Sequence, residues 1–258
     1  ALKDDASQIA KYSPMEGHRC EGEEQCGMHI NCCNANGPRA FALIPDFAVK
    51  KMGNEVYVNY YGDMSASLEN GHNKVLVKQH TTYPVSNVID ITIDVTKENV
   101  FGLHLRVPVW SAQTVITLNG EELKDICPGT YHAITRKWKK GDHIQIILDM
   151  PARLLEQNQM QAIVRGPIVL ARDSRFNDGF VDETLVVDSE DGIVKAEVDS
   201  VPGFAWMRLK VPVTVGTDLE GVGMYRNISF CDFASAGNTW DKQVRYRVWI
   251  PRTLDVKK

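Results

Sequence analysis

Short stretches in which apolar and polar residues alternate recur from residue 54 onward, with turn residues between them. Alternation of this kind places one face of a strand in a core and the other in solvent, and it is typical of antiparallel sheets. The Asn70-Gly71 and Asn119-Gly120 pairs are typical of tight hairpin turns. This arrangement predicts a β-sandwich. The predicted strands cover residues 56–60, 74–80, 88–95, 100–107, 114–118 and 143–150.

A second set of strands, less regular than the first, follows Met150-Pro151. A short polar stretch, LLEQNQ at 154–159, leads into it, and a glycine-rich loop interrupts it at 216–223. We therefore predict a mainly β chain with two consecutive antiparallel β-sandwich domains, at residues 53–154 and 155–258. The predicted strands of the second domain lie at 161–171 and around 184–187, 192–198, 206–215, 227–233 and 244–250.

Helix is predicted only near the start of the chain, in residues 37–52. Pro38 suits a first helical turn, and Pro45 is expected to kink or divide the helix. Residues 1–52 are treated as one segment that precedes the sandwiches. The apolar residues at helical spacing are Phe41, Ile44, Phe47 and Ala48.

Composition excludes several classes of partner. The chain has 258 residues of which 43% are hydrophobic, enough to bury a sizeable core. Its net charge of −4 and the lack of a basic run give no reason to expect nucleic acid or an anionic membrane as partner. No apolar stretch approaches the ~20 residues of a membrane span. The first residues lack the features of a secretory signal and contain no initiator Met, so we expect a piece of a longer protein.

Residues 18–39 concentrate the side chains that carry chemistry. They hold four of the six cysteines and two of the seven histidines. Thiolate and imidazole are ligands that zinc prefers, and a thiolate is a strong nucleophile. Neighbouring cysteines are awkward as a mutual disulfide and natural as two ligands of one soft metal. The residues concerned are His18, Cys20, Cys26, His29, Cys32 and Cys33.

Structural roles for these thiols stay open on the residues alone. Cys20 and Cys26 can form a loop disulfide in an oxidising compartment, and Cys32 and Cys33 can pack as small apolar residues at a helix start. The C-x5-C-x5-C-C spacing matches no common zinc-finger pattern. Exposed tryptophans on sandwiches can stack on sugars, although tryptophan at a strand end more often belongs to a core. The tryptophans are Trp110, Trp138, Trp206, Trp240 and Trp249.

The run Cys32-Cys33-Asn34-Ala35-Asn36-Gly37-Pro38-Arg39 has the form C-C-x-x-N-x-x-R. This motif resembles that of glycoside hydrolase family 127, the β-L-arabinofuranosidase-like enzymes first catalogued as a bacterial domain of unknown function. Seven further blocks agree in order over nearly the whole chain. They are VYVNYYG (56–62), TTYP (81–84), LRVPVW (105–110), VITLNG (115–120), YHAITRKWKKGD (131–142), RGPIVLA (165–171) and RVWIP (247–251).

The resemblance implies the C-terminal portion of a retaining glycoside hydrolase, with an (α/α)6 barrel whose last segment would be residues 1–52. Cys32 would be the catalytic nucleophile and a Zn2+ ligand, and Cys33 a second Zn2+ ligand. A glutamate and a third cysteine from an upstream E-x-C motif, and the acid/base glutamate, would come from barrel sequence outside this chain. The partners would be that barrel and an arabinose-containing plant oligosaccharide. The implied compartment is the bacterial periplasm or cytoplasm.

Two features depart from the family pattern. Asn34-Ala35 stands where the family often has two prolines, which implies a less rigid loop and a different substrate. Glu24-Gln25-Cys26 spells E-x-C, but it lies so close to Cys32 that we interpret it as a coincidence. The alternative function is a non-catalytic β-sandwich module that binds glycans or docks against a partner domain.

Overall fold

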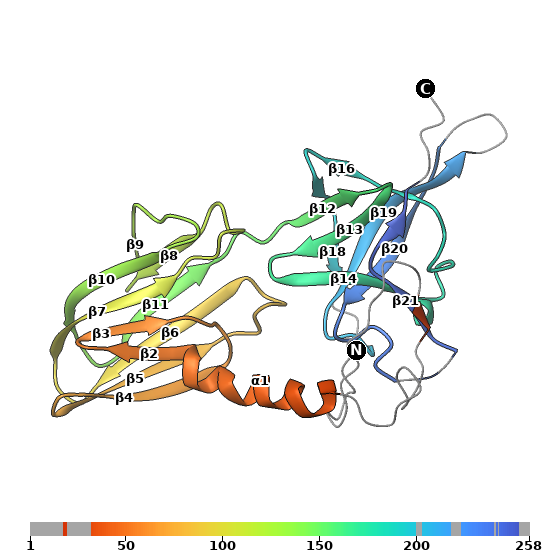
Figure 1. The fold of residues 1–258 in the computed structure, drawn as a ribbon. Helices are drawn as coiled ribbons and strands as arrows, with labels where there is room; N and C mark the ends of the chain where they lie inside the picture. Colours follow the sequence, from red (N-terminus) through yellow and green to blue (C-terminus); the bar gives the residue numbers. More distant parts are fainter. Residues whose placement is uncertain are drawn as a thin grey trace. The chain divides into compact units, whose positions relative to one another are not determined.

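The computed structural model describes residues 18–19, 32–199, 203–217, 223–239, 241 and 243–252. These residues are mainly β, with sandwich-like sheets, so the predicted fold class is confirmed (Figure 1). The chain divides into two compact units. Arg39–Met150 forms one, and the described parts of Ala1–Pro38 and Pro151–Lys258 form the other. The domain limits at 52/53 and 154/155, and the assignment of residues 1–52 to a barrel, stay predictions.

The helix α1 spans Cys32–Ala48, earlier than the range 37–52 predicted for it. Its predicted end is wrong because Val49–Met52 forms strand β2, in which Val49 is buried and pairs with Val58. Long-range pairing overrides the helical spacing here. The predicted division at Pro45 does not occur. Pro45 lies in the last turn, where only a few residues of helix follow the backbone hydrogen bond that proline cannot make.

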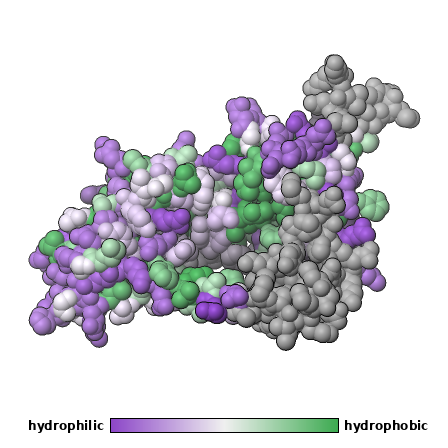
Figure 2. All heavy atoms as spheres, in the orientation of Figure 1, coloured by the Kyte–Doolittle hydropathy of each residue, from purple (hydrophilic) through white to green (hydrophobic). Residues whose placement is uncertain are grey.

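Several large apolar side chains on α1 are exposed to solvent. Figure 2 shows apolar surface where α1 lies in the lower part of the view. The exposed apolar side chains are Phe41, Leu43, Ile44 and Phe47. No helix in the described residues has the length and apolar character needed to cross a membrane.

The unit Arg39–Met150 is described throughout and contains two sheets that share one core (Figure 1). The smaller sheet has the order β10-β7-β3-β2, and the larger has the order β4-β5-β6-β11-β8-β9. Their strands are β2 (Val49–Met52), β3 (Glu55–Val58), β4 (Met64–Asn70), β5 (Asn73–His80), β6 (Val88–Val95), β7 (Asn99–Arg106), β8 (Val115–Leu118), β9 (Glu121–Glu122), β10 (Tyr131–Trp138) and β11 (Asp142–Ile147).

Strict alternation of apolar and polar residues explains why most long strands of this unit were predicted from the sequence. In β6, Ile89, Ile91 and Ile93 are fully buried while Asp90 and Thr92 face outward. Burying the apolar face of a strand lowers the free energy of the folded state, and this determines which face of each strand points into the core. One pairing departs from the predicted antiparallel arrangement, since β3 runs parallel to β7.

Besides β2 and the two-residue strand β9, two longer strands of this unit were missed. Strand β4 has the sequence MSASLEN, in which the inward apolar residues Met64, Ala66 and Leu68 are only partly buried, and it lies at the edge of its sheet. Strand β10 is also an edge strand, and of its inward positions only Ile134 and Trp138 are buried and apolar. Edge strands need less burial than central ones, so their sequence signal is weaker.

The described strands of the second unit form one branched, twelve-stranded sheet (Figure 1). Its main order is β15-β19-β20-β14-β13-β12-β17-β16, and β1, β18, β21 and β22 attach to it. The strands are β1 (His18–Arg19), β12 (Ala152–Gln157), β13 (Met160–Arg165), β14 (Ile168–Asp173), β15 (Val186–Val187), β16 (Ser189–Glu190), β17 (Ile193–Val194), β18 (Glu197–Asp199), β19 (Arg208–Thr217), β20 (Gly223–Asp232), β21 (Arg245–Arg247) and β22 (Ile250–Pro251).

Strand β12 corrects the interpretation of residues 154–159 as a polar connector. Most of that stretch is strand, and it pairs with β13 along its length. Asn158 and Gln159 form the turn between the two strands with φ of +50° and +60°. The turn contains no glycine, and the last three residues of β12, Leu155 to Gln157, are all exposed with no alternation, so neither the turn nor the strand produces a strong sequence signal.

Candidate functional site

The cysteine pair stands at the start of α1. Cys32 and Cys33 are the first two residues of the helix. The side chains of residues 32–35 are outside what the structure describes, and so are the whole of Cys20, Cys26 and His29. The roles predicted for Cys32 and Cys33 therefore stay predictions.

The backbone of residues 18–19, at the start of the range 18–39 that holds four cysteines, pairs with the second unit. Strand β1 pairs with β21, with His18 opposite Tyr246 and Arg19 opposite Arg245. Strand β21 pairs in turn with β14, where Tyr246 lies opposite Asp173. Strand β21 thus lies between β1 and β14, and β14 ends at Asp173, in a cluster of buried polar side chains.

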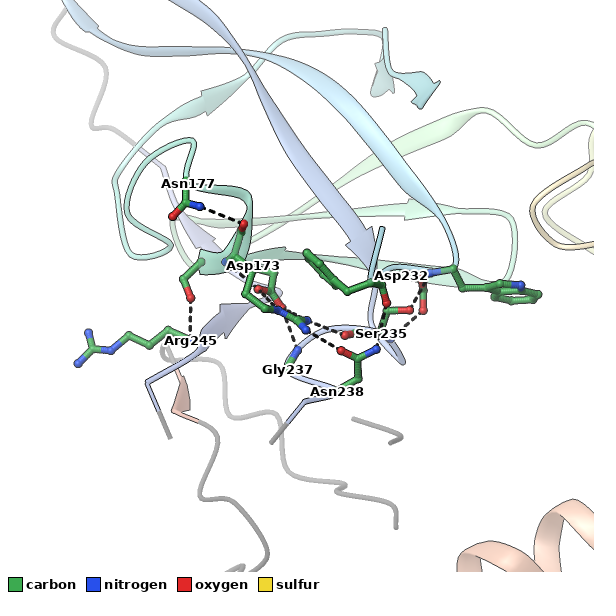
Figure 3. Close-up of polar contacts among 11 residues, drawn as sticks. Asp173, Asn177, Asp232, Ser235, Gly237, Asn238 and Arg245 are labelled. Atoms are coloured by element: carbon green, nitrogen blue, oxygen red, sulfur yellow. Dashed lines mark hydrogen bonds and ion pairs between the residues drawn. The ribbon is translucent and has the colours of Figure 1, made fainter. Parts of the chain in front are cut away.

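Asp173 is the centre of that cluster, shown in Figure 3. Its side chain is fully buried and forms a bidentate pair with Arg175, with Nε to Oδ1 at 2.9 Å and Nη2 to Oδ2 at 2.7 Å. The backbone N–H of Arg175 donates to Oδ1, which caps the 3-10 helix η1 (Ser174–Phe176). The backbone N–H of Gly237 donates to Oδ2 at 2.8 Å. Four donors therefore satisfy both oxygens of this buried carboxylate.

Arg175 links Asp173 to the loop that follows β20. Its Nη1 donates to Asn238 Oδ1 at 2.7 Å and its Nη2 to the Ser235 carbonyl at 3.0 Å. The guanidinium lies 3.5 Å from the centre of the Phe204 ring. The Phe204 ring covers one face of the guanidinium, and the hydrogen bonds occupy its edges. The cluster therefore holds the loop in place.

A second buried charge group lies along β14 and β20. Arg172, of which the side chain is 1% exposed, has its Nη atoms 3.8 Å from Asp178 and 3.6 Å from Glu183. Glu183 also pairs with Arg226. Burial lowers the pKa of Arg172, while Asp178 and Glu183 act in the opposite direction. These pairs fasten the loop between β14 and β15, whose Phe180 is 85% exposed. No local sequence pattern predicted either buried cluster, because each joins residues 172–183 to partners far along the chain, such as Arg226 and Asn238.

The other described cysteines do not extend the candidate site. Cys231 and Cys127 are both free thiols. Burial raises the pKa of Cys231 well above its usual value, and the nearby Asp173 and Asp232 raise it further. Such a thiol stays protonated and is a poor nucleophile. Among the described residues, no group of three or more His, Cys, Asp or Glu side chains is arranged to hold a metal.

The tryptophans divide between core and surface. Trp138 is fully buried and donates its indole N–H to the Phe101 carbonyl at 3.0 Å. Trp110 and Trp249 are partly buried against core clusters. Among the described tryptophans only Trp206 is exposed, at 60%. Trp240 lies outside the described residues.

Comparison with known proteins gives one family match. Residues 55–150 match the family described as β-L-arabinofuranosidase, GH127 middle domain. This range begins with β3 and ends at the last residue of the first compact unit. The sequence matches no curated protein.

Solved structures share the fold of nearly the whole chain. A GH127 β-L-arabinofuranosidase from Geobacillus stearothermophilus T6 has a TM-score of 0.77 at 18% identity over 98% of this chain. A second GH127 β-arabinofuranosidase has a TM-score of 0.79 at 20% identity over 100% of this chain. A structure titled glycoside hydrolase has a TM-score of 0.78 at 20% identity over 98%.

The chain spans less than half of each of these proteins, namely 44%, 44% and 46% of their lengths. The fold likeness extends beyond the matched domain to the second unit, whereas the sequence match is confined to the first. The resemblance inferred from the sequence is thereby confirmed, because residues 55–150 match the middle domain of glycoside hydrolase family 127 and structures of that family share the fold of the chain.

Proposed function

We propose that this chain is the C-terminal portion of a retaining glycoside hydrolase that acts on arabinose-containing oligosaccharides, with Cys32 as its nucleophile. The proposal rests on the position of the cysteine motif in the fold. The C-C-x-x-N-x-x-R motif opens α1, and α1 leads directly through β2 into a GH127 middle domain. The start of a helix has a partial positive charge, which favours a negatively charged group such as a thiolate.

The proposed reaction proceeds in two displacements. The thiolate sulfur of Cys32 attacks the anomeric carbon, and the bond to the leaving-group oxygen breaks as a general acid supplies a proton to that oxygen. Water then attacks the same carbon, transfers a proton to the conjugate base of that acid, and releases Cys32 as thiolate. Two displacements at one carbon retain its configuration. By the resemblance, the acid is a glutamate outside this sequence.

The donor set fits a zinc ion. Two neighbouring thiols are the soft ligands that Zn2+ prefers, and a single residue step between them is poor geometry for a mutual disulfide. Cys32 and Cys33 would both hold the metal. Bound Zn2+ would stabilise the negative charge on the sulfur of Cys32, both before attack and when the sulfur leaves.

The test uses the complete protein that contains this sequence. Cys32→Ser should abolish turnover of an aryl β-L-arabinofuranoside and leave the fold intact, because a serine alkoxide is a far poorer leaving group than a thiolate. Cys33→Ser should weaken zinc binding and lower turnover, with excess zinc restoring part of it. Zinc content is measured alongside activity for both variants.

A trapped intermediate distinguishes the roles of the two cysteines directly. A slow substrate or an epoxide inhibitor should leave one sugar on Cys32, located by mass spectrometry of peptides. An adduct on Cys33, on a carboxylate, or on no residue would refute Cys32 as the nucleophile. Cys127→Ser is a matched control, since Cys127 is a free, exposed thiol and its loss should leave activity and labelling unchanged.

A further inference from the structure

The outward face of the sheet β10-β7-β3-β2 carries aromatic side chains where a solvent-facing sheet is usually polar. Val56 and Leu103 on two of its strands are fully buried in the core. Alternation therefore turns Tyr57 and His104, their neighbours, to the other face. The opposite sheet of this unit shows the ordinary pattern on its outer face, with charged pairs such as Lys78–Asp94.

The aromatic side chains form one continuous row across three strands. The ring of Tyr57 on β3 lies parallel to that of His104 on β7, with centroids 4.2 Å apart and an interplanar angle of 9°. Tyr131, at the start of β10, meets Tyr57 edge to face at 5.5 Å. The parallel pairing of β3 and β7 sets Tyr57 directly opposite His104 and so creates the row.

Polar contacts hold both ends of the row in a fixed orientation. At one end, Glu55 Oε2 lies 2.7 Å from His104 Nε2. At the other, the hydroxyl of Tyr131 donates to Asn59 Oδ1 at 2.6 Å, and the Asn59 amide donates to the Phe47 carbonyl at 2.8 Å. A surface held in this way loses little side-chain entropy when it binds a ligand.

Gly102 makes room for the carboxylate of Glu55. The two residues lie opposite each other in the β3–β7 pairing, and a Cβ at Gly102 would stand 1.7 Å from Glu55 Oε2. The side chain of Glu55 crosses the space where a residue-102 side chain would be and reaches His104. Sheet stability alone calls for no such arrangement, because an ordinary side chain on a strand stabilises it better than glycine.

The groups at the two ends remain accessible to solvent. Tyr131 is 43% exposed and the side chain of Glu55 is 40% exposed, whereas that of His104 is 19% exposed. A carboxylate has about four lone-pair positions, and the contact with His104 occupies one. The row thus presents an aromatic surface at one end and hydrogen-bond acceptors at the other.

We propose that the row Glu55–His104–Tyr57–Tyr131 binds a neutral oligosaccharide, one sugar ring packing on Tyr131 and hydroxyls of a neighbouring ring donating to Glu55. An aromatic ring suits the C–H face of a sugar, and an acceptor fixes its orientation. The choice of a glycan as ligand rests on the proposed function, while the row shares no residue with the cysteine pair. It would hold substrate chains without taking part in hydrolysis.

The test measures binding and not turnover. The chain of residues 1–258 is titrated with arabino-oligosaccharides of three to five residues, using calorimetry and amide shifts in NMR. We expect saturable binding, with shifts centred on β3, β7 and β10. Tyr131→Ala should weaken binding at least tenfold, and Glu55→Gln severalfold. Tyr131→Phe should retain most of the affinity, because it keeps the ring and folds without a cavity.

Tyr225→Ala is the matched control, since Tyr225 is a 73% exposed tyrosine on β20 of the other unit. It should leave binding unchanged. Absence of saturable binding, an unaltered affinity in Tyr131→Ala, or an equal loss in Tyr225→Ala would each overturn the proposal. Repeating the titration with Cys32→Ser separates the two proposals, because binding should persist in this variant whatever the role of Cys32.

Discussion

At the scale of single residues, Asp173 shows how one buried carboxylate organises its surroundings. Taking a carboxylate out of water costs several kcal/mol unless donors replace the lost hydration. Asp173 receives two hydrogen bonds from the Arg175 side chain and one each from the backbone N–H groups of Arg175 and Gly237. Removing the Asp173 carboxylate leaves the guanidinium of Arg175, whose side chain is 16% exposed, without its counter-charge.

We predict that Asp173→Ala lowers the free energy of unfolding of the second unit by about 3–5 kcal/mol, as expected when one partner of a buried ion pair is removed. The exposed pair Lys195–Glu190, 3.2 Å apart in the same unit, supplies the control. Glu190→Ala should change stability by less than about 1 kcal/mol. The stability of both variants is measured by urea denaturation, with amide hydrogen exchange in β14 as the local probe. Equal effects of the two substitutions would contradict the prediction.

At the scale of elements, the turn between β8 and β9 shows how two residues set the register of a hairpin. Asn119 and Gly120 have φ of +51° and +88°, the left-handed values that a type I′ turn requires at both positions. The side chain of Asn119 adds contacts to the neighbouring strand, since its amide donates to Asp142 Oδ1 and its Oδ1 accepts from the His143 N–H. The turn thereby fixes β11 as well as its own hairpin.

Gly120→Ala should destabilise the first unit by about 1–2 kcal/mol, the cost of a left-handed conformation for an L-residue. Steric contact adds nothing, because no atom lies within 4 Å of a Cβ built there. Gly203→Ala is the control, because space is also open at Gly203 and its φ lies outside the left-handed region. That change should be neutral or stabilising. Thermal unfolding of the two variants checks the prediction, which a neutral Gly120→Ala would disprove.

At the scale of the whole molecule, the chain spans less than half the length of the glycoside hydrolases that share its fold. Each compact unit has its own buried apolar residues, so each is organised as a domain. Of the four zinc ligands that the resemblance implies, only Cys32 and Cys33 are assigned within this sequence. The acid/base glutamate is assigned outside it.

We therefore predict that the chain of residues 1–258 does not hydrolyse an aryl β-L-arabinofuranoside, even with added zinc. Without an acid to protonate the leaving oxygen, the first displacement loses a factor of ~10²–10⁴ in rate, and incomplete zinc ligation lowers it further. Release of the aryl alcohol is the measurement, with the complete protein as positive control. Turnover by residues 1–258 that Cys32→Ala abolishes would show that it is wrong to assign the acid/base glutamate and the other two zinc ligands to sequence outside this chain.

The sequence by itself determined the mainly β fold and the candidate chemistry. Strands such as β6 follow from strict alternation, and the Asn119-Gly120 turn follows from the conformations open to those residues. The motif at Cys32-Cys33 and the order of the later blocks pointed to the family that the domain match then supported. These signals are local, because each depends on residues close together in the chain.

Only the tertiary structure decided which side chains meet. Tyr57, His104 and Tyr131 lie far apart in the sequence, and no pattern around any of them predicts their row. The row exists because β3 pairs in parallel with β7 and β7 pairs with β10. Arg175 likewise joins Asp173 to Asn238, because its guanidinium donates to both side chains. Such contacts depend on strand order and register, which are fixed by burying all the apolar faces at once, and no short stretch of sequence carries that information.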